Sequence, residues 1–210
     1  MEIEKINLNK YNRAEHYRHY MQHKCSITVS TVIDVTNLQR YTRKNNLRTY
    51  PILLWVISNA VNAVPDCRNT IDSNGDLARY SRIDPAYIAQ NNETKTIYCL
   101  STPFTPDLQE FYKHCTYDID VNNNNKSMFP QGETPKNTFS VSANAQLQFT
   151  SMSISVEKQP FAPIITLGRI YKKWFKAYLP ICIQVNHACC DGYHIEQIIN
   201  EIDKTIKMLK

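Results

Sequence analysis

The run PILLWVISNAVNAV, which begins at Pro51 and stops before Pro65, constrains the fold of this chain more than any other stretch. Proline fits the first turn of a helix, where its missing N–H has no intrahelical use, and a proline that follows a helix ends it. The helix predicted between the two prolines is apolar on nearly every side, and such a helix must be buried. The rest of the chain therefore has to cover it.

The size and composition of the chain favour one core. With 210 residues and a hydrophobic fraction of 42%, the chain can bury one sizeable core, and we expect residues 1–210 to form a single domain. No run of about 18 apolar residues occurs, so no membrane span is expected. The charged N-terminal segment MEIEKINLNKYN has no continuous apolar part, so no signal peptide is expected.

The cysteines and the charges limit the compartment and the partners. The 7 cysteines are odd in number and have no C-x-x-C spacing, which predicts reduced thiols and a cytoplasmic protein. The net charge is +5, but the basic residues are dispersed. We therefore expect no nucleic-acid partner, whereas a mild positive field favours a small anionic ligand.

Periodicity and helix breakers predict helices and strands in irregular alternation. The predicted helices span residues 12–21, 36–46, 51–64, 106–118 and the C-terminal residues from Asp191. The predicted strands span 26–35, short pieces within 77–100 after a turn at 73–76, a strand pair within 139–158, and the runs 162–171 and 177–186. Residues 122–136 are predicted to form a loop. This mixture favours an α/β fold, a two-layer sandwich with a mixed β-sheet.

The segment QVNHACCDGYH, residues 184–194, joins the last predicted strand to the C-terminal helix. Its His187 lies at a strand end, where rigid backbone presents a side chain at the rim of a sheet. Imidazole has an ordinary pKa of about 6.5, which makes it a usable base near neutrality. Asp191 can cap the helix and fix the loop, and Gly192 lets the backbone pass close to a neighbour. Spacing alone leaves both a catalytic and a structural histidine open.

Two other clusters have plain interpretations. His16, His19 and His23 have ligand-like spacing on the first predicted helix, but no cysteine or carboxylate set completes a metal site, and we predict none. Cys189 and Cys190 are interpreted as small packed hydrophobic side chains and not as a redox pair.

Six segments together resemble a known family. NHACCDGYH fits the H-x-x-x-D-G signature of coenzyme A-dependent acyltransferases and is most similar to the matching segment of the trimeric, non-hexapeptide chloramphenicol acetyltransferases. Five further segments have counterparts in the same order: YNRAEHY (11–17), YPILLWVISNAVNA (50–63), FPQGETPKN (129–137), VSAN (141–144) and FAPIITLG (161–168). The resemblance covers essentially the whole chain and implies helices packed on one face of the mixed sheet.

The resemblance implies an activity. Enzymes of this family transfer an acetyl group from acetyl-CoA to a hydroxyl of chloramphenicol, which inactivates the antibiotic and gives resistance. It implies that His187 is the general base and that Ser142 donates a hydrogen bond to the tetrahedral oxyanion. It also implies that Asp191 pairs with Arg13, which would tie the N-terminal helix to the loop that aims His187. No metal is implied.

The resemblance further implies binding residues and an assembly. The acceptor-binding residues would be Tyr20, Thr166, Ile97 and Ile154. Coenzyme A would be held by Arg48, Tyr50 and Arg169, because guanidinium groups suit phosphates. The family builds its sites between the subunits of a homotrimer, so His187 would come from one subunit and most of the acceptor pocket, including Tyr20, from its neighbour.

Departures from the family pattern leave the acceptor open. Asn186 replaces the first histidine of a pair, Gln146 stands where a tryptophan is usual, and Ile97 replaces an aromatic residue that a flat ring could stack on. One alternative is an acyltransferase of the same mechanism that acts on a different alcohol or thiol. Another, of a different class, is a binder without catalysis that sequesters a ligand.

Overall fold

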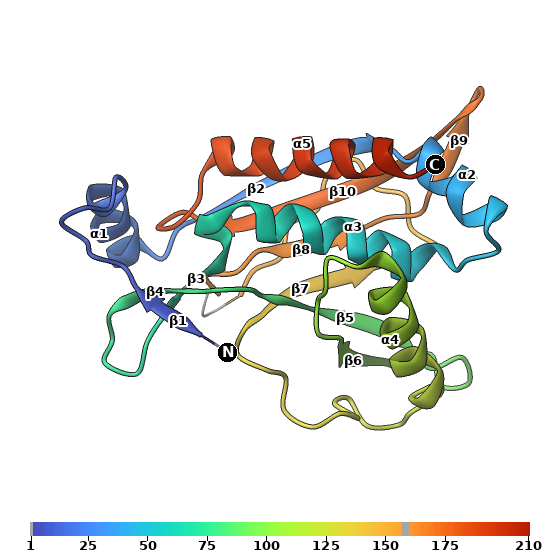
Figure 1. Cartoon of the computed structure of the whole chain (residues 1–210), viewed down its shortest axis with the longest axis horizontal. Coiled ribbons are helices and arrows are strands. Elements are labelled where there is room, and N and C mark those ends of the chain that lie inside the picture. The colour runs from blue at the N-terminus through green and yellow to red at the C-terminus, as the bar shows by residue number, and fades with distance from the viewer. Residues whose placement is uncertain (1, 157–159) are drawn as a thin grey trace.

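The computed structural model describes residues 2–156 and 160–210. In this part of the chain, seven strands form a mixed sheet in the order β2–β10–β8–β7–β5–β6, with β9 paired to β10 (Figure 1). Strand β7 is parallel to β5 and β8, whereas β10 is antiparallel to β8 and β2. The strands are β2 (Ser26–Asp34), β5 (Asp84–Gln90), β6 (Ile97–Ser101), β7 (Thr138–Ala143), β8 (Ile164–Leu167), β9 (Tyr171–Lys173) and β10 (Lys176–Asn186).

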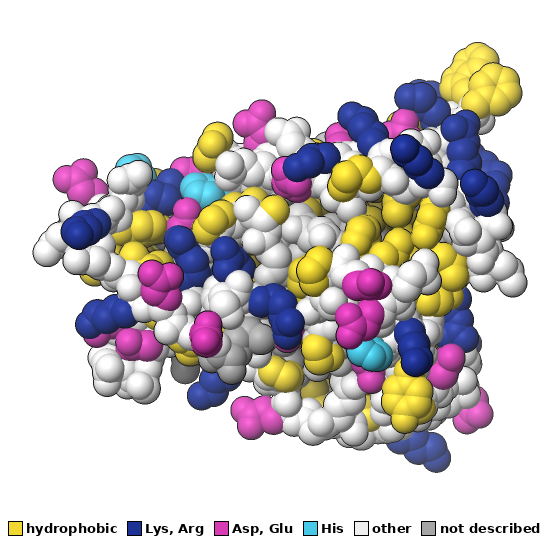
Figure 2. Space-filling view, viewed as in Figure 1, with side chains coloured by type: hydrophobic (Ala, Val, Ile, Leu, Met, Phe, Trp, Pro, Cys, Tyr) yellow, Lys and Arg dark blue, Asp and Glu magenta, His cyan; other side chains and the backbone are white. Residues whose placement is uncertain are grey.

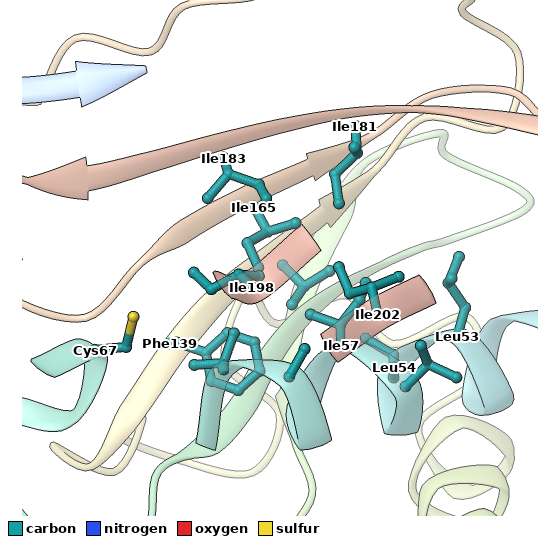
Figure 3. Packing of buried hydrophobic residues seen from close by; sticks show 14 of the residues in the cluster. Leu53, Leu54, Ile57, Cys67, Phe139, Ile165, Ile181, Ile183, Ile198 and Ile202 are labelled. Atoms are coloured by element: carbon teal, nitrogen blue, oxygen red, sulfur yellow. The ribbon is translucent and has the colours of Figure 1, made fainter. Parts of the chain in front are cut away.

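Two helices cover one face of this sheet. Helices α3 (Thr49–Ala63) and α5 (Gly192–Met208) lie side by side across it (Figure 1). Figure 3 shows Ile183 of β10 and Ile165 of β8 directed toward Ile57 of α3 and Ile198 of α5. Each of these side chains is fully buried, and a buried isoleucine typically contributes about 1.5–3 kcal/mol. The mixed α/β fold and the burial of the proline-flanked helix are confirmed.

The bounds of three other helices agree with the predicted ranges to within a few residues. They are α1 (Ala14–His23), α2 (Thr36–Lys44) and α4 (Leu108–Val121). Helix α3 begins at Thr49, so Pro51 is its third residue and still lies in the first turn, which needs no N–H. Asp107 caps α4 by accepting the N–H of Glu110, and Asp191 caps α5 as predicted. Residues 122–136 contain no helix or strand.

A second, small sheet was not predicted. Strands β1 (Ile3–Lys5), β4 (Leu77–Tyr80) and β3 (Asn69–Ile71) pair in the order β1–β4–β3, next to the short 3-10 turn η1 (Pro65–Arg68). Strands of three or four residues are too short to show a reliable alternation of polar and apolar side chains. This sheet and α1 lie at the same end of the molecule (Figure 1).

The predicted strand pair within residues 139–158 is wrong in its second half. Its first half is β7, but residues 144–156 contain no strand, and residues 157 and 158 lie outside the described part of the chain. Both edges of β7 are already occupied by β5 and β8, so a hairpin partner has no place beside it. The segment instead crosses the face opposite the helices, where the N–H of Met152 donates to Ser30 Oγ (3.2 Å) and the thiol of Cys182 donates to the Met152 carbonyl (3.2 Å).

The surface has one apolar projection. The turn between β9 and β10 carries Trp174 and Phe175, whose exposed fractions are 87% and 91%. Figure 2 shows apolar atoms standing out from the body where Figure 1 draws this hairpin. Trp174 has φ 57°, in the left-handed region that bulky residues rarely adopt. None of the helices in the described residues has both the length and the apolar character of a membrane span.

Candidate active site

His187 follows directly after β10 and is half-buried. Its backbone N–H donates to the carbonyl of Cys25 (2.9 Å), which continues the β10–β2 ladder by one residue. Its ring Nδ1 lies 3.2 Å from the carbonyl oxygen of Cys190. A carbonyl can only accept, so this contact places the proton of the neutral ring on Nδ1 and leaves Nε2 with a free lone pair.

Tyr20 covers the ring of His187. The two ring centroids are 3.8 Å apart with an interplanar angle of 24°, so the rings are stacked. Tyr20 belongs to α1, which is therefore held against the turn that carries His187. This contact lies within one chain. The expectation that Tyr20 serves the His187 of a neighbouring subunit stays a prediction.

Arg13 and Asp191 form an ion pair between two helix starts. Arg13 Nη1 donates to Asp191 Oδ2 at 2.5 Å, although 178 residues separate the two in sequence. Arg13 is the N-cap residue of α1, and Asp191 is the N-cap of α5, where its Oδ1 accepts the N–H of Tyr193. The exposed side-chain fractions are 14% for Arg13 and 30% for Asp191. The pair ties the turn of residues 187–191 to the start of α1, and this pairing is the one that the resemblance implied.

Two carboxylates near this ion pair, Asp191 and Asp66, have pKa values below the ordinary value of an aspartate. Burial by itself raises the pKa of Asp191, but hydrogen bonds from His194 and Arg13 outweigh it and lower the pKa to about 2. Burial also opposes ionisation of Asp66, a residue of η1, and hydrogen bonds from His194 and Tyr11 outweigh it, so this pKa is also about 2. Both groups are therefore ionised at neutral pH.

Ser142 and Thr166 are neighbours on adjacent strands, but one chain does not bring them to His187. Ser142 is paired with Thr166, and Thr166 with Cys182 of β10. Because β7 and β10 run in opposite directions, their last residues point to opposite sides of the sheet (Figure 1). Ser142, next to last in β7, is level with Cys182 in the middle of β10, whereas His187 lies just beyond the end of β10. From Cys182 to Asn186, β10 advances by four residues, or about 13 Å along the strand. The lateral separation of β7 from β10 adds two strand spacings of about 4.8 Å each.

The residues predicted to hold coenzyme A lie at the Ser142 end. The hydroxyl of Tyr50 donates to the carbonyl of Ile88 in the last half of β5, and burial raises the pKa of Tyr50. Arg48 precedes α3 and is paired with Asp120 of α4 through contacts of 2.7 and 3.1 Å, with both side chains more than half exposed.

Arg169 and the loop before it lie at this end as well. Arg169 is exposed and follows Gly168, where an added Cβ would lie only 3.0 Å from the carbonyl oxygen of Leu147. This close approach lets the N–H of Arg169 donate to the same oxygen at 2.8 Å. The loop after β7 is therefore packed tightly on the end of β8.

The two remaining predicted binding residues, Ile97 and Ile154, do not contact His187 in the described part of the chain. Ile97 lies away from it along the sheet, and Ile154 lies on the sheet face opposite the helices. Ile97 begins β6, which is antiparallel to β5, and so it lies at the Ser142 end with 53% of its surface exposed. Ile154 is half-buried in the segment that crosses the uncovered face of the sheet. One chain thus collects His187, Tyr20, Arg13 and Asp191 at one end and the other predicted residues elsewhere.

Comparison with known proteins decides the family. The profile of the family described as chloramphenicol acetyltransferase matches residues 1–203. This chain belongs to the chloramphenicol acetyltransferase family. It is therefore an acyltransferase, and the alternative of a binder outside the enzyme classes is not supported.

Individual chloramphenicol acetyltransferases agree with this membership. One from Bacillus pumilus is 34% identical over 192 residues, which are 90% of this chain and 87% of that protein. Chloramphenicol acetyltransferase 2 of Escherichia coli is 31% identical over 205 residues, 96% of each chain. A solved structure of a chloramphenicol acetyltransferase has a TM-score of 0.88 over 100% of both chains at 18% identity, which shows the shared fold.

Sequence reasoning missed two residues of the group around Asp191, namely His194 and Asp66. His194 is 6% exposed, and its ring lies between Asp191 (2.9 Å) and Asp66 (3.4 Å). The spacing of Asp191 and His194 is that of a helix capping box, so this signal was present in the sequence. The contact with Asp66 had no local signal. No group of three metal-ligating side chains occurs among the described residues, and His16, His19 and His23 do not form one.

The two ionised carboxylates, Asp66 and Asp191, should make this protein less stable in acid. A carboxyl group whose folded-state pKa lies below its unfolded value stabilises the fold above the unfolded pKa and loses this contribution as pH falls through the folded pKa. For the mostly buried Asp66, the shift from 3.8 to about 2 corresponds to about 2 kcal/mol. We expect the urea unfolding free energy to decline from about pH 5 downward, and to decline less steeply in Asp66→Asn. The exposed Glu196→Gln is the control, and equal slopes in both variants would contradict the assignment.

Proposed function

We propose that this protein transfers the acetyl group of acetyl-CoA to a hydroxyl of chloramphenicol, inactivating the antibiotic, with His187 as the general base. One observation carries the proposal: the Nδ1–H of His187 is directed to the Cys190 carbonyl, so the lone pair of Nε2 is available on a turn held by Arg13 and Asp191. A base must be neutral and held in one tautomer to take a hydroxyl proton, and the contact with the Cys190 carbonyl supports the second condition.

The reaction would proceed by direct attack. Nε2 of His187 takes the hydroxyl proton as the alcohol oxygen bonds to the carbonyl carbon of the thioester. The Ser142 hydroxyl donates a hydrogen bond to the resulting oxyanion, and such a donor is typically worth about 10²–10³ in rate. When the C–S bond breaks, the thiolate of coenzyme A leaves and the imidazolium returns the proton to it. Thr166, beside Ser142, lines the same place.

Acetyl-CoA would be held at the Ser142 end of the sheet. Arg169 is exposed there, and guanidinium is suited to contact with a phosphate. Arg48 is exposed too, but its partner is the Asp120 carboxylate, which a phosphate would replace. Tyr50 would contact coenzyme A through its ring, because its hydroxyl already donates to the Ile88 carbonyl.

The separation of Ser142 from His187 supports a site shared between subunits of a homotrimer. A base and an oxyanion donor that act on one carbonyl must lie within a few ångströms of the reacting atoms, and within one chain Ser142 and His187 are more than about 13 Å apart. Strand β2 is at the edge of the sheet with β10 on one side, which leaves a nine-residue edge for contacts with another chain. We also propose one domain in a cytoplasmic protein, which the match over residues 1–203 and the free cysteines support.

A subunit-complementation experiment tests the shared site. Ser142→Ala and His187→Ala proteins are each expected to be nearly inactive. If Ser142 and His187 of one site come from different chains, unfolding and refolding the two variants together restores some sites with both residues, and activity returns. Refolding each variant alone is the control. No recovery in the mixture, with mixed oligomers shown by co-purification of one variant on an affinity tag carried by the other, would contradict the shared site.

The function itself is tested by release of free coenzyme A. With acetyl-CoA, the wild-type protein is expected to release thiol only when chloramphenicol is present, and the product should carry one acetyl ester by mass. A panel of other alcohols and thiols tests the alternative acceptor, which the isoleucine at position 97 and the exposed Gln146 favour. Turnover on a panel member with none on chloramphenicol would keep the mechanism and overturn the acceptor.

A further inference from the structure

The buried ring of His194 lies between two carboxylates from different elements. Its Nδ1 is 2.9 Å from Asp191 Oδ1, and its Nε2 is 3.4 Å from Asp66 Oδ2. Only 7% of its side chain is exposed. Asp191 is thereby contacted from two sides, since its second oxygen accepts from Arg13.

A neutral imidazole cannot serve both carboxylates. It has one N–H, so one of its nitrogens would face a carboxylate oxygen with a lone pair. Nδ1 could instead accept the N–H of Asp191, but that contact is longer, at 3.2 Å, than the 2.9 Å to Oδ1. The charged ring, with a proton on each nitrogen, can donate to both carboxylates.

We propose that His194 is a positioning residue of the acetyl-transfer site, and that as an imidazolium it ties Asp191 to Asp66 and so holds the turn that carries His187. The inference rests on the proposed function and adds a charge requirement to it. His187 must be neutral while His194, seven residues later, must be charged.

The groups around His194 decide the sign of its pH dependence. The titratable and charged groups that act on it or on its partners are Asp66 of η1, Asp191 of the turn, Arg13 before α1, Arg79 of β4, Tyr11, and the thiols of Cys189 and Cys190. Cys67 contacts the thiol of Cys190. The hydrogen bond to Asp66 is the largest influence and raises the pKa of His194, burial lowers it, and the contact with Asp191 raises it. The pKa is raised in the folded state, so the support given to the turn is present at low pH and is lost as pH rises through that pKa.

The charge required of His194 predicts a fall in rate on the alkaline side. The rate falls when His194 loses its proton, because the turn that carries His187 then loses its tie to Asp66. In His194→Gln the alkaline fall disappears, and kcat drops by about tenfold, less than the roughly hundredfold that a 1 Å misplacement can cost. In Asp66→Asn the fall moves to lower pH. Glu196→Gln, on the exposed side of α5, leaves the profile unchanged.

The experiment follows both rings by NMR in protein labelled with ¹⁵N-histidine, with the His194 signals assigned by their loss in His194→Gln. In the wild type, both nitrogens of His194 are expected to stay protonated above the ordinary pKa of about 6.5. The ring of His187 is expected to show the Nδ1–H tautomer in the wild type and a mixture of tautomers in His194→Gln. This readout does not need turnover, so it separates the inference from the proposed function.

The outcomes are distinct. A His194 that is neutral at or below the ordinary pKa, or a His187 tautomer unchanged in His194→Gln, would overturn the inference even in an active enzyme. The predicted NMR result in a protein without acetyl transfer would leave the tie between Asp66, His194 and Asp191 standing and overturn the proposed function instead.

Discussion

Replacement of His187 by alanine is expected to lower kcat for acetyl transfer by about 10²–10⁴, the usual contribution of a general base. The reason is local. Nε2 carries the only free lone pair of the ring, because Nδ1 donates to the Cys190 carbonyl. The ring is only half-buried and stacks on Tyr20 at the surface of the turn, so its removal should leave the fold intact. The measurement is thiol release at saturating acetyl-CoA and chloramphenicol, with unfolding followed in the same samples.

Two comparisons make this result specific. His114→Ala removes an exposed histidine from α4 and should leave kcat unchanged. His187→Ala should still bind acetyl-CoA, since Arg48 and Arg169 lie at the other end of the chain's sheet. A kcat for His187→Ala within a few-fold of wild type would show that another group takes the proton.

Replacement of Arg13 by alanine is expected to lower the free energy of unfolding by about 3 kcal/mol, the lower end of the range for breaking a buried ion pair, because Asp191 is 30% exposed. The same change frees the turn from α1, and a displacement of His187 by 1 Å can cost about a hundredfold in rate. Urea unfolding and thiol release measured on one preparation report the two effects separately.

The chemistry of Arg13 suggests how to separate charge from packing. Within the described residues its Nε and Nη2 are buried without a hydrogen-bond partner, so the pair also carries a desolvation cost. The double variant Arg13→Ala/Asp191→Ala should therefore lose less stability than the sum of the two single variants. Lys204→Ala, which breaks an exposed pair with Glu201 on α5, is the control and should cost well under about 1 kcal/mol. A loss equally small for Arg13→Ala would mean that the pair does not hold the turn.

The elements that the sequence predicts well are long and have clear ends. Helix α3 has a proline in its first turn and another just after it, and α5 has the Asp191 cap and one isoleucine stripe. Both signals are local, so they survive in the structure. The segment 144–156 alternates like a strand but has no free strand edge beside β7, and pairing of that kind depends on topology and not on periodicity.

The site is predictable only in part for the same reason. Nothing local links Arg13 to Asp191 across 178 residues, and the pair could be anticipated only from the resemblance to a family. The tie between His194 and Asp66 has no sequence signal apart from the capping-box spacing. The separation of Ser142 from His187 within one chain follows from the strand directions and register, which neither motif encodes.

The cysteines of this fold bear on how turnover can be followed. Those that are free and buried are Cys67, Cys115, Cys182, Cys189 and Cys190. Burial raises the pKa of Cys115 to about 12, so almost none of it is thiolate near neutrality, and the thiolate is the reactive form. The colour formed by a chromogenic sulfhydryl reagent in the reaction should therefore come mainly from the thiol of the released coenzyme A. Cys25 and Cys99 are free and only half-buried, so they can colour in the native protein as well. Colour from the protein alone beyond these two thiols would count molecules that have lost their native interior.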